Sequence, residues 1–179
     1  PGPKFAIGAT DWNGWAGDIA GSRYQAKPGI KAEDVPKLKV KWAFAIPGAT
    51  VMPAQPVIVA GRVFFGSLNG KVYSLDAASG CMYWQYDAGG AVRSAVNVIR
   101  SGADHLAIFG DMRGSLHAVN ALDGKQLWTV KLDDHPVARV TGSPVYHEGR
   151  IYVPMSSVEE AAAQNPKYEC CKFRGSVSS

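Results

Sequence analysis

The sequence lacks most of the motifs by which enzymes and binding domains are recognised. It has no Gly-x-Ser-x-Gly elbow, no phosphate-binding loop and no Cys-x-x-Cys pair, which excludes the usual hydrolase, nucleotide-binding and zinc signatures. Cys-x-x-Cys-His is also missing, so no haem is attached covalently to these residues. No apolar run approaches the length of a membrane span, and helix-period patterns are nearly absent. Val, Ile, Tyr and Phe cluster instead between Gly, Pro and Asn, which predicts an all-β protein.

Charge and histidine content exclude two further kinds of site. The net charge is +4, from 19 basic and 15 acidic residues, and the basic residues are scattered along the chain. A nucleic-acid partner usually requires a clustered basic face, so none is predicted. The four histidines, at positions 105, 117, 135 and 147, show no metal-ligand spacing and are interpreted as structural or surface residues. No signal peptide opens the sequence, and its start at Pro-Gly-Pro indicates processing or truncation.

The most informative feature is a phrase that occurs twice. Residues 65–84 return as residues 109–128, with Phe65 matched by Phe109 and Trp84 by Trp128, at a constant offset of 44. A fixed period of about 40 to 50 residues, filled with strand-type residues, is typical of a propeller blade. The repeat therefore predicts a β-propeller.

Each copy of the phrase has the same local order. Residues 72–75 and 116–119 are predicted to be short strands, and the turns after them, 76–80 and 120–124, begin with Asp or Asn and end with Gly. Asp and Asn cap turns through their side chains, and Gly accepts a positive φ. The next strand is predicted to end in Trp, which is large enough to fill the gap between adjacent blades.

The repeat also divides the chain. Residues 38–44 alternate and contain Trp42, as the last strand of a blade would. We expect an N-terminal loop or hairpin region (1–37), the closing strand of a first blade (38–54), two blades (55–92 and 93–142) and an incomplete blade (143–179). About three blades cannot close a ring, so we expect the chain to be part of a longer propeller and to be inactive by itself.

The last predicted blade departs from the repeat by an insertion. Gly175 takes the place of Gly114 at a spacing of 61 instead of 44, which makes the loop before the third strand about 17 residues longer. The loop holds a helical fragment at 158–163 and the adjacent residues Cys170 and Cys171. The two cysteines form either a strained vicinal disulfide, which would imply an oxidising compartment, or two adjacent thiols that are buried or free.

Together these features resemble the quinoprotein dehydrogenases, which bind pyrroloquinoline quinone (PQQ). The resemblance rests on the repeated Leu/Val-Asp/Asn-Ala-x-x-Gly-x-x-x-Trp phrase, the Trp-x-x-Trp-x-Gly-Asp opening and the cysteine pair. It covers essentially all 179 residues. Within the family, the loops most similar to those of the polyvinyl-alcohol dehydrogenases are 109–113, 134–142, 154–160 and 168–176.

The resemblance implies an eight-bladed, periplasmic or secreted propeller with PQQ and Ca²⁺ near its axis. It further implies the oxidation of a secondary alcohol, such as polyvinyl alcohol, and the transfer of electrons to a cytochrome c. In the family a vicinal disulfide covers one face of the quinone, and Cys170 and Cys171 match that pair. The family usually carries the pair at the start of an inner strand, whereas here it lies in a loop between strands. The catalytic carboxylate belongs to a later blade, so no catalytic residue is predicted within this chain.

Three arginines are the predicted partners for the three carboxylates of the quinone. Arg174 follows the cysteine pair, and Arg93 and Arg139, the latter with Thr141, precede predicted inner strands and are further candidates. Each of these arginines is equally compatible with an ion pair at the rim of the propeller.

Glu159 and Glu169 lie in the insertion and are candidate ligands for Ca²⁺, which binds oxygen. For any one of these residues, a solvated helical turn is the favoured interpretation.

A non-enzymatic propeller scaffold is the alternative hypothesis, since outer-membrane assembly factors carry a similar repeat. The loop around Cys170 distinguishes the two hypotheses, because a scaffold needs neither an adjacent cysteine pair nor an arginine beside it.

Overall fold

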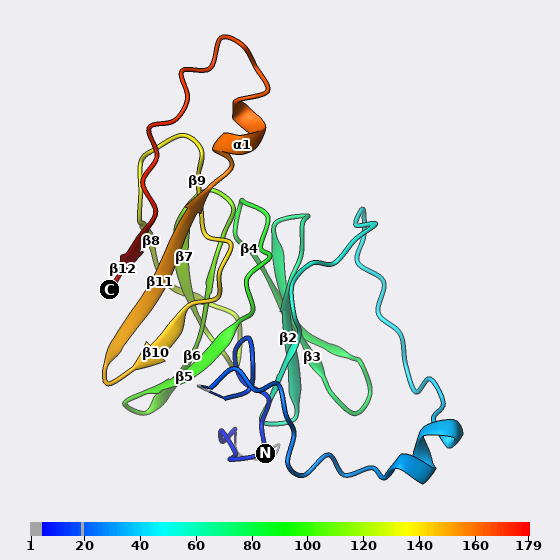
Figure 1. Ribbon diagram of the computed structural model, residues 1–179. Helices are drawn as coiled ribbons and strands as arrows, with labels where there is room; N and C mark the ends of the chain where they lie inside the picture. Colours follow the sequence, from blue (N-terminus) through cyan, green and yellow to red (C-terminus); the bar gives the residue numbers. More distant parts are fainter. Residues whose placement is uncertain (1–4, 19) are drawn as a thin grey trace.

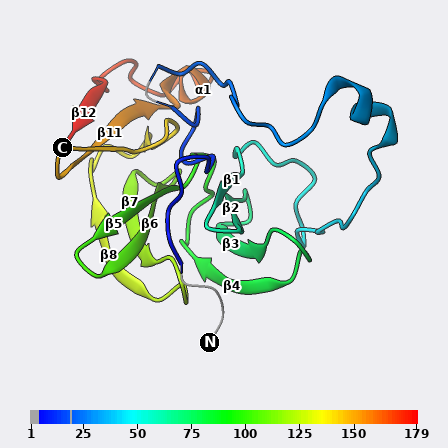
Figure 2. The ribbon, with the colours of Figure 1, turned by 90° about the horizontal axis from the view of Figure 1, so that it is seen from below.

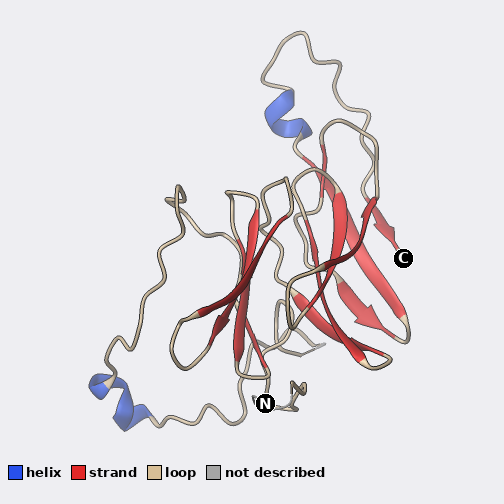
Figure 3. Ribbon diagram, turned by 180° about the vertical axis from the view of Figure 1, so that it is seen from behind, coloured by secondary structure: helices blue, strands red, loops and turns tan. Residues whose placement is uncertain are grey.

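Almost all regular structure of the chain is β-sheet. The computed structural model describes residues 5–18 and 20–179, and strands dominate it (Figure 3). The helices in the described ranges are a 3₁₀ helix, η1 (Ala32–Lys37), and one short α-helix, α1 (Glu159–Ala162). None of the helices in these ranges has the length and apolar character needed to cross a bilayer. The prediction of an all-β protein is confirmed.

Two four-stranded antiparallel sheets follow one another along the chain, each with its strands in sequence order. The two sheets even share an irregularity: the strand register shifts at Ser74/Leu75 in the first sheet and at Ala118/Val119, 44 residues later, in the second. Figure 2 shows β1 and β5 closest to the N-terminal segment and β4 and β8 on the outside. The strands are β1 (Val57–Val59), β2 (Arg62–Gly66), β3 (Lys71–Asp76) and β4 (Met82–Asp87), then β5 (Asn97–Ser101), β6 (Asp104–Gly110), β7 (Ser115–Asn120) and β8 (Gln126–Lys131).

The third sheet is built from β10 (Val145–His147), β11 (Arg150–Ser157) and β12 (Ser176–Ser178), in that order. A two-residue strand, β9 (Ala138–Arg139), pairs with the far end of β11. The connection between β11 and β12 holds α1 and forms the long excursion at the top of Figure 1. This excursion is the insertion that the broken repeat predicted.

The third strand of each repeat is buried on both faces. The four central residues of β3 and of β7 are all buried, so side chains on both faces of the strand meet apolar neighbours. A sheet packed on both sides needs apolar residues at successive positions, which is why these strands do not alternate between apolar and polar. Between the first two sheets lies a continuous core that includes Val57, Phe64, Val72, Val96, Ala107, Phe109 and Val119.

A tryptophan from one sheet docks on a turn of the next. The indole Nε1 of Trp84 donates a hydrogen bond to the carbonyl of Ala121 over 3.0 Å, and the side chain is buried. Its ring lies against Gly124, which has a φ of +75°, and a Cβ added there would approach Trp84 Cδ2 to 2.8 Å. Two features therefore require glycine at this position: the turn needs a positive φ, and the tryptophan ring leaves no room for a Cβ. Trp84 and Trp128 lie within β4 and β8, whereas the sequence predicted that these strands end at Trp.

Residues 38–44, predicted to form a strand, are not paired in any sheet of the described residues. The segment nevertheless packs as a neighbouring blade would: Trp42 Nε1 donates to the carbonyl of Ala77 over 3.2 Å, and the ring covers Gly80. Phe44 and Ile46 cover the same face of the first sheet. No described strand runs beside this segment to accept its backbone hydrogen bonds, so it is extended without becoming part of a sheet.

The N-terminal segment joins the inner strands of two sheets. Trp12 exchanges both backbone hydrogen bonds with Ile58 of β1, each 2.9 Å long. Asn13 does the same for Val98 of β5 through its side-chain amide, at 2.7 and 2.8 Å. The predicted tight loop in this region is therefore an ordered clamp across β1 and β5.

The docking geometry predicts an asymmetry between two glycines. Gly124→Ala has to accommodate both a positive φ and a clash with Trp84, whereas Gly149, at a φ of +84°, has no atom within 4 Å of an added Cβ. Both substitutions carry the backbone penalty of about 1–2 kcal/mol, and Gly124→Ala adds an overpacking cost of about 1–3 kcal/mol. Urea unfolding of the full-length protein measures the difference. Equal losses of stability for the two variants would contradict the docking account.

Candidate functional site

One end of the sheets collects every connection that carries a predicted site residue. The turns between β2 and β3 and between β6 and β7 lie at this end, and the insertion between β11 and β12 is their counterpart. The segments that cross from one sheet to the next lie beside these turns, because Ala88 N donates to Gly70 O over 2.8 Å and Leu132 N to Gly114 O over 2.9 Å. We call this end the insertion end; it is the upper end of Figure 1.

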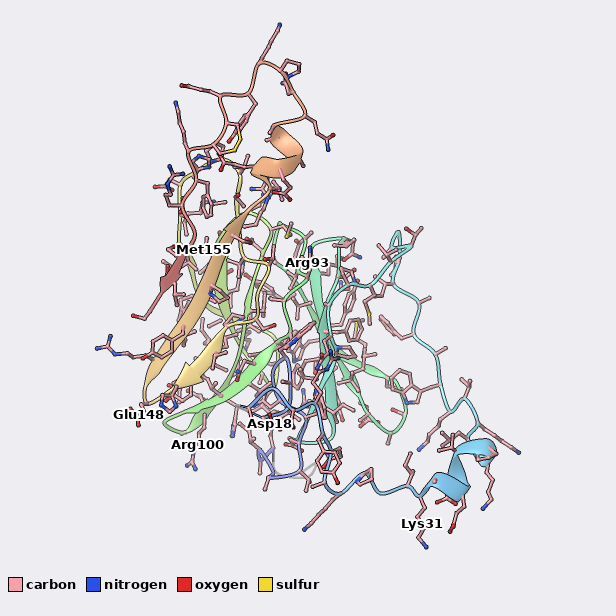
Figure 4. All side chains as sticks on the ribbon, viewed as in Figure 1. Asp18, Lys31, Arg93, Arg100, Glu148 and Met155 are labelled. Atoms are coloured by element: carbon pink, nitrogen blue, oxygen red, sulfur yellow. A yellow bond between two sulfur atoms is a disulfide. The ribbon has the colours of Figure 1, made fainter. Side chains whose placement is uncertain are left out.

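Cys170 and Cys171 form a disulfide at the insertion end. The peptide between them is cis, and both residues are exposed. The disulfide lies beside α1, where Figure 4 shows it as a yellow bond to the left of the helix. Of the two possibilities that the sequence left open, the structure has the disulfide.

Glu159 organises the backbone around this disulfide. Its Oε1 accepts hydrogen bonds from the Tyr168 hydroxyl over 2.9 Å and from Lys172 N over 2.8 Å, and its Oε2 accepts from Phe173 N over 3.1 Å. Burial by itself would raise the pKa of the Glu159 carboxyl. The three donors, helped by His135 nearby, outweigh burial and lower the pKa below its usual value of 4.5.

Arg174 folds back onto the backbone that follows the disulfide. Its Nη1 donates to the carbonyl of Cys171 over 3.1 Å and to that of Phe173 over 2.8 Å. The side chain is exposed and uses one of its nitrogens for these bonds, which leaves the rest of the planar donor fork free for an external acceptor. The structure thus brings three predicted residues, Cys170, Cys171 and Arg174, into one small unit.

Arg139 and Thr141 lie at the base of the same insertion. Arg139 pairs with Ser156 in the sheet, and Thr141 Oγ1 is 2.7 Å from Ser156 Oγ. Arg139 Nη1 donates to the carbonyls of Pro136 and Ala138 at 3.0 and 2.7 Å. These contacts place both residues beside the end of β11 that leads into α1.

Arg93 lies on the neighbouring crossover. It is exposed, and the residue after it, Ser94, is buried and joined to Gly110 of β6 in both directions at 3.0 and 3.1 Å. Figure 4 shows Arg93 toward the insertion end, with Arg100 and Glu148 at the opposite end. In the described part of the chain, none of the arginines forms an ion pair with a carboxylate. The predicted rim ion pairs are therefore not formed among these residues.

A buried ionic network links the two crossovers, and sequence reasoning missed it. His117 and Asp111 are 3 % and 1 % exposed, and His117 Nε2 is 3.0 Å from Asp111 Oδ2. A carboxylate only accepts, so Nε2 donates to Asp111. On the other side of the ring, Nδ1 lies 3.1 Å from Thr129 Oγ1 and 3.3 Å from the hydroxyl of Tyr86 in the preceding sheet, which itself donates to Gln126. The available signal was that His117 replaces Tyr73 and Asp111 replaces Ser67 of the preceding repeat.

The Asp111 turn holds both crossovers in place. Its backbone carbonyl accepts from Val140 N over 3.0 Å, and the next residue, Met112, donates to the carbonyl of Ala91 over 2.8 Å. Asp111 Oδ1 also caps its own turn by accepting from Arg113 N and Ser115 N, each at 2.9 Å. The segments that carry Arg93 and Arg139 are thus tied to the backbone of one turn, which the buried Asp111 carboxylate caps.

The two predicted calcium ligands have protein partners instead. Glu159 uses both oxygens within the insertion, and Glu169 pairs with Lys172 at 2.5 Å. Within residues 5–18 and 20–179, no group of three or more His, Cys, Asp or Glu side chains is arranged to hold a metal ion. The described residues therefore do not form the calcium site that the sequence suggested.

Comparison with known proteins places this arrangement in a recognised class. The family model described as "Outer membrane protein assembly factor BamB" matches residues 28–167. The chain is 46% identical to polyvinylalcohol dehydrogenase of a Pseudomonas species, over 98% of this chain and 28% of that protein. It is 42% identical to polyvinylalcohol dehydrogenase of Sphingopyxis sp. strain 113P3, over 99% and 27%. The chain thus spans less than a third of the length of these relatives.

Solved structures show the same fold. The quinohemoprotein alcohol dehydrogenase ADHIIG of Pseudomonas putida HK5 superposes with a TM-score of 0.75 at 24% identity, over 84% of this chain and 23% of that one. A europium-containing methanol dehydrogenase gives a TM-score of 0.71 at 20% identity, over 84% and 28%.

The fold and these similarities define a β-propeller of the quinoprotein type, which confirms the predicted fold class. The chain belongs to the PQQ quinoprotein dehydrogenase family, within which it is similar to the polyvinyl-alcohol dehydrogenases.

The buried network predicts a pH-dependent loss of stability. In His117→Phe, Asp111 keeps its backbone donors but loses the imidazole, and we expect a loss of about 2–4 kcal/mol near neutral pH. Burial raises the pKa of Asp111, but its donors lower it overall below 3.8. The stabilisation is therefore complete above that value and is lost as the pH falls through the lowered pKa. Urea unfolding of the full-length protein across the acid range should show the two proteins converging.

The preceding repeat supplies the control. Asp111→Ser with His117→Tyr reproduces the Ser67 and Tyr73 pair, so the double variant should recover part of the stability lost by His117→Phe. A single variant as stable as the wild type at neutral pH would contradict the network.

Proposed function

We propose that the protein containing this chain is a PQQ-dependent alcohol dehydrogenase that oxidises secondary alcohols, with polyvinyl alcohol as the substrate. The observation that carries the proposal is the disulfide at the insertion end with Arg174 bonded to the carbonyl of Cys171. The names of the relatives support the reaction class and the polymer substrate. We further propose a periplasmic location and a cytochrome c as electron acceptor, in line with the oxidising compartment that a disulfide indicates.

The residues at the insertion end fit the chemistry of the quinone. PQQ is flat and carries three carboxylates, so it needs an apolar or sulfur surface for the ring and arginine forks for the acid groups. The insertion end offers an exposed disulfide, and the arginines there have no carboxylate partner among the described residues. When bound, PQQ supplies the redox chemistry, accepting two electrons from the alcohol.

Each predicted residue has a distinct proposed role. Cys170 and Cys171 cover one face of the quinone ring. Arg174 binds one of its carboxylates while it remains hydrogen-bonded to the carbonyl of Cys171. Arg93 and Arg139, which lie on the two crossovers, bind the remaining carboxylates of the quinone. Thr141 adds a hydroxyl beside Arg139. Residues 55–92, 93–142 and 143–179 act as successive blades that aim these groups at one end.

Ca²⁺ is the metal that the family resemblance implies, but Glu159 and Glu169 do not fit it. Both carboxylates are engaged with protein donors, and they belong to no larger group of ligands among the described residues. We therefore assign no step to Ca²⁺ within this chain, and we assign no general base here either.

The alternative is a non-enzymatic propeller scaffold. The matching family model, which is described as an outer membrane assembly factor, is compatible with it. A scaffold requires blades and docking tryptophans, which this chain has, but it has no use for a vicinal disulfide with a tethered guanidinium. The insertion therefore favours the dehydrogenase.

Arg174 provides the test of the cofactor proposal. Arg174→Gln keeps hydrogen-bonding capacity but removes the charge, so PQQ should bind the full-length protein about 10- to 100-fold more weakly, since bonds between charged groups contribute about 1.5–3 kcal/mol. Arg100→Gln removes the same charge at the opposite end and should leave binding unchanged (Figure 4). Calorimetric titration with PQQ in the presence of Ca²⁺ gives the affinities. A wild-type protein that binds no PQQ and reduces no dye with a secondary alcohol would remove the proposal.

A further inference from the structure

A buried carboxylate in an exposed insertion requires an explanation. Glu159 is 6 % exposed, although it belongs to the insertion that extends beyond the sheets (Figure 1). Burying a charge is costly unless hydrogen bonds compensate for it, and here three donors do so. The arrangement is too complete to be a solvated helical turn.

The three groups that donate to Glu159 lie on both sides of the cysteine pair in the sequence. Tyr168 lies two residues before Cys170, and the backbone amides of Lys172 and Phe173 follow Cys171 directly. One carboxylate therefore holds the chain on both sides of the cysteine pair. Between α1 and β12 the loop has no regular structure, and its other hydrogen bonds join residues at most four positions apart, such as Tyr168 N to Asn165 O.

The same unit is attached to the propeller body. The ring of Phe173 packs edge-on against His135, with centroids 5.7 Å apart, and contacts the apolar cluster that contains Leu116 and Ala138. Val158 N, just before Glu159, donates to the carbonyl of Val137 over 3.1 Å. Glu159 thus connects the disulfide loop to the crossover that carries Arg139.

We propose that Glu159 is a positioning residue that holds the Cys170–Cys171 loop against the bound quinone, acting through the backbone amides of Lys172 and Phe173. This role rests on the proposed function as a PQQ enzyme and assigns Glu159 to the loop instead of to a metal. Without the carboxylate, the loop would sample many conformations, and the disulfide would cover the cofactor only part of the time.

The experiment uses the full-length apoprotein on a Cys81→Ser background, because Cys81 is a free, exposed thiol. Glu159→Gln cannot accept from both backbone amides and the tyrosine, and Tyr168→Phe removes one donor without changing the charge. Glu148→Gln is the control, since Glu148 is exposed at the opposite end of β11 (Figure 4). A water-soluble phosphine reduces the disulfide, and alkylation followed by mass measurement counts the thiols formed.

We expect the disulfide to be reduced about tenfold faster in Glu159→Gln, and by a smaller factor in Tyr168→Phe, because hydrogen bonds that restrain the loop are lost. Glu148→Gln should match the wild type. Saturating PQQ should protect the wild-type disulfide from the phosphine and protect that of Glu159→Gln much less. A residue that only contributed to global stability would not change this protection by the ligand.

The outcomes separate the two proposals. If the wild type binds PQQ but Glu159→Gln is reduced and protected like the wild type, the role of Glu159 is wrong and the proposed function stands. If Glu159→Gln is reduced faster but PQQ protects no variant although it binds, the loop does not cover the quinone and the positioning role fails. If the wild type binds no PQQ, the proposed function fails, and the reduction rates still show whether Glu159 restrains the loop.

Discussion

The contact between a tryptophan and the turn of the next sheet is the constraint on which the whole arrangement depends. Trp84 donates to Ala121 and lies on Gly124, and Trp42 does the same for the preceding turn. The Trp84 contact sets the second sheet at a fixed position relative to the first, and the Trp42 contact holds the N-terminal segment against the first sheet. Connections that are equivalent in the sequence are consequently brought to the same end of the molecule, where short turns and one long insertion lie side by side.

At that end, two buried carboxylates do different work. The Asp111 carboxylate caps the turn whose backbone bonds the crossovers of Arg93 and Arg139, whereas the Glu159 carboxylate binds the insertion that carries the disulfide. Both have a lowered pKa because donors outweigh burial, so both remain charged at neutral pH. The exposed disulfide and arginines that we propose to contact the cofactor thus lie on segments whose backbone is held in place near the buried carboxylates of Asp111 and Glu159.

Much of the fold was predictable because it is periodic. The offset of 44 residues identified the strands, the glycine turns and the insertion, since each depends on local residue types that recur. The segment around Trp42 was predicted as a strand but is only extended, because strand formation requires a neighbour that local sequence does not reveal. The insertion was recognised as the place of an adjacent cysteine pair, with a disulfide as one of two possibilities, yet the hydrogen bonds of Glu159 escaped prediction. Its donors are backbone amides and a hydroxyl, which have no sequence signature.

The central claim is that the propeller repeat directs the Cys170–Cys171 loop toward a redox cofactor at the insertion end. A structure of the full-length protein with PQQ bound tests it most directly. The account predicts density for the quinone ring in contact with the two sulfurs, with the Arg174 guanidinium at one of its carboxylates. Quinone density remote from the disulfide, with the insertion facing solvent at the periphery, would contradict it.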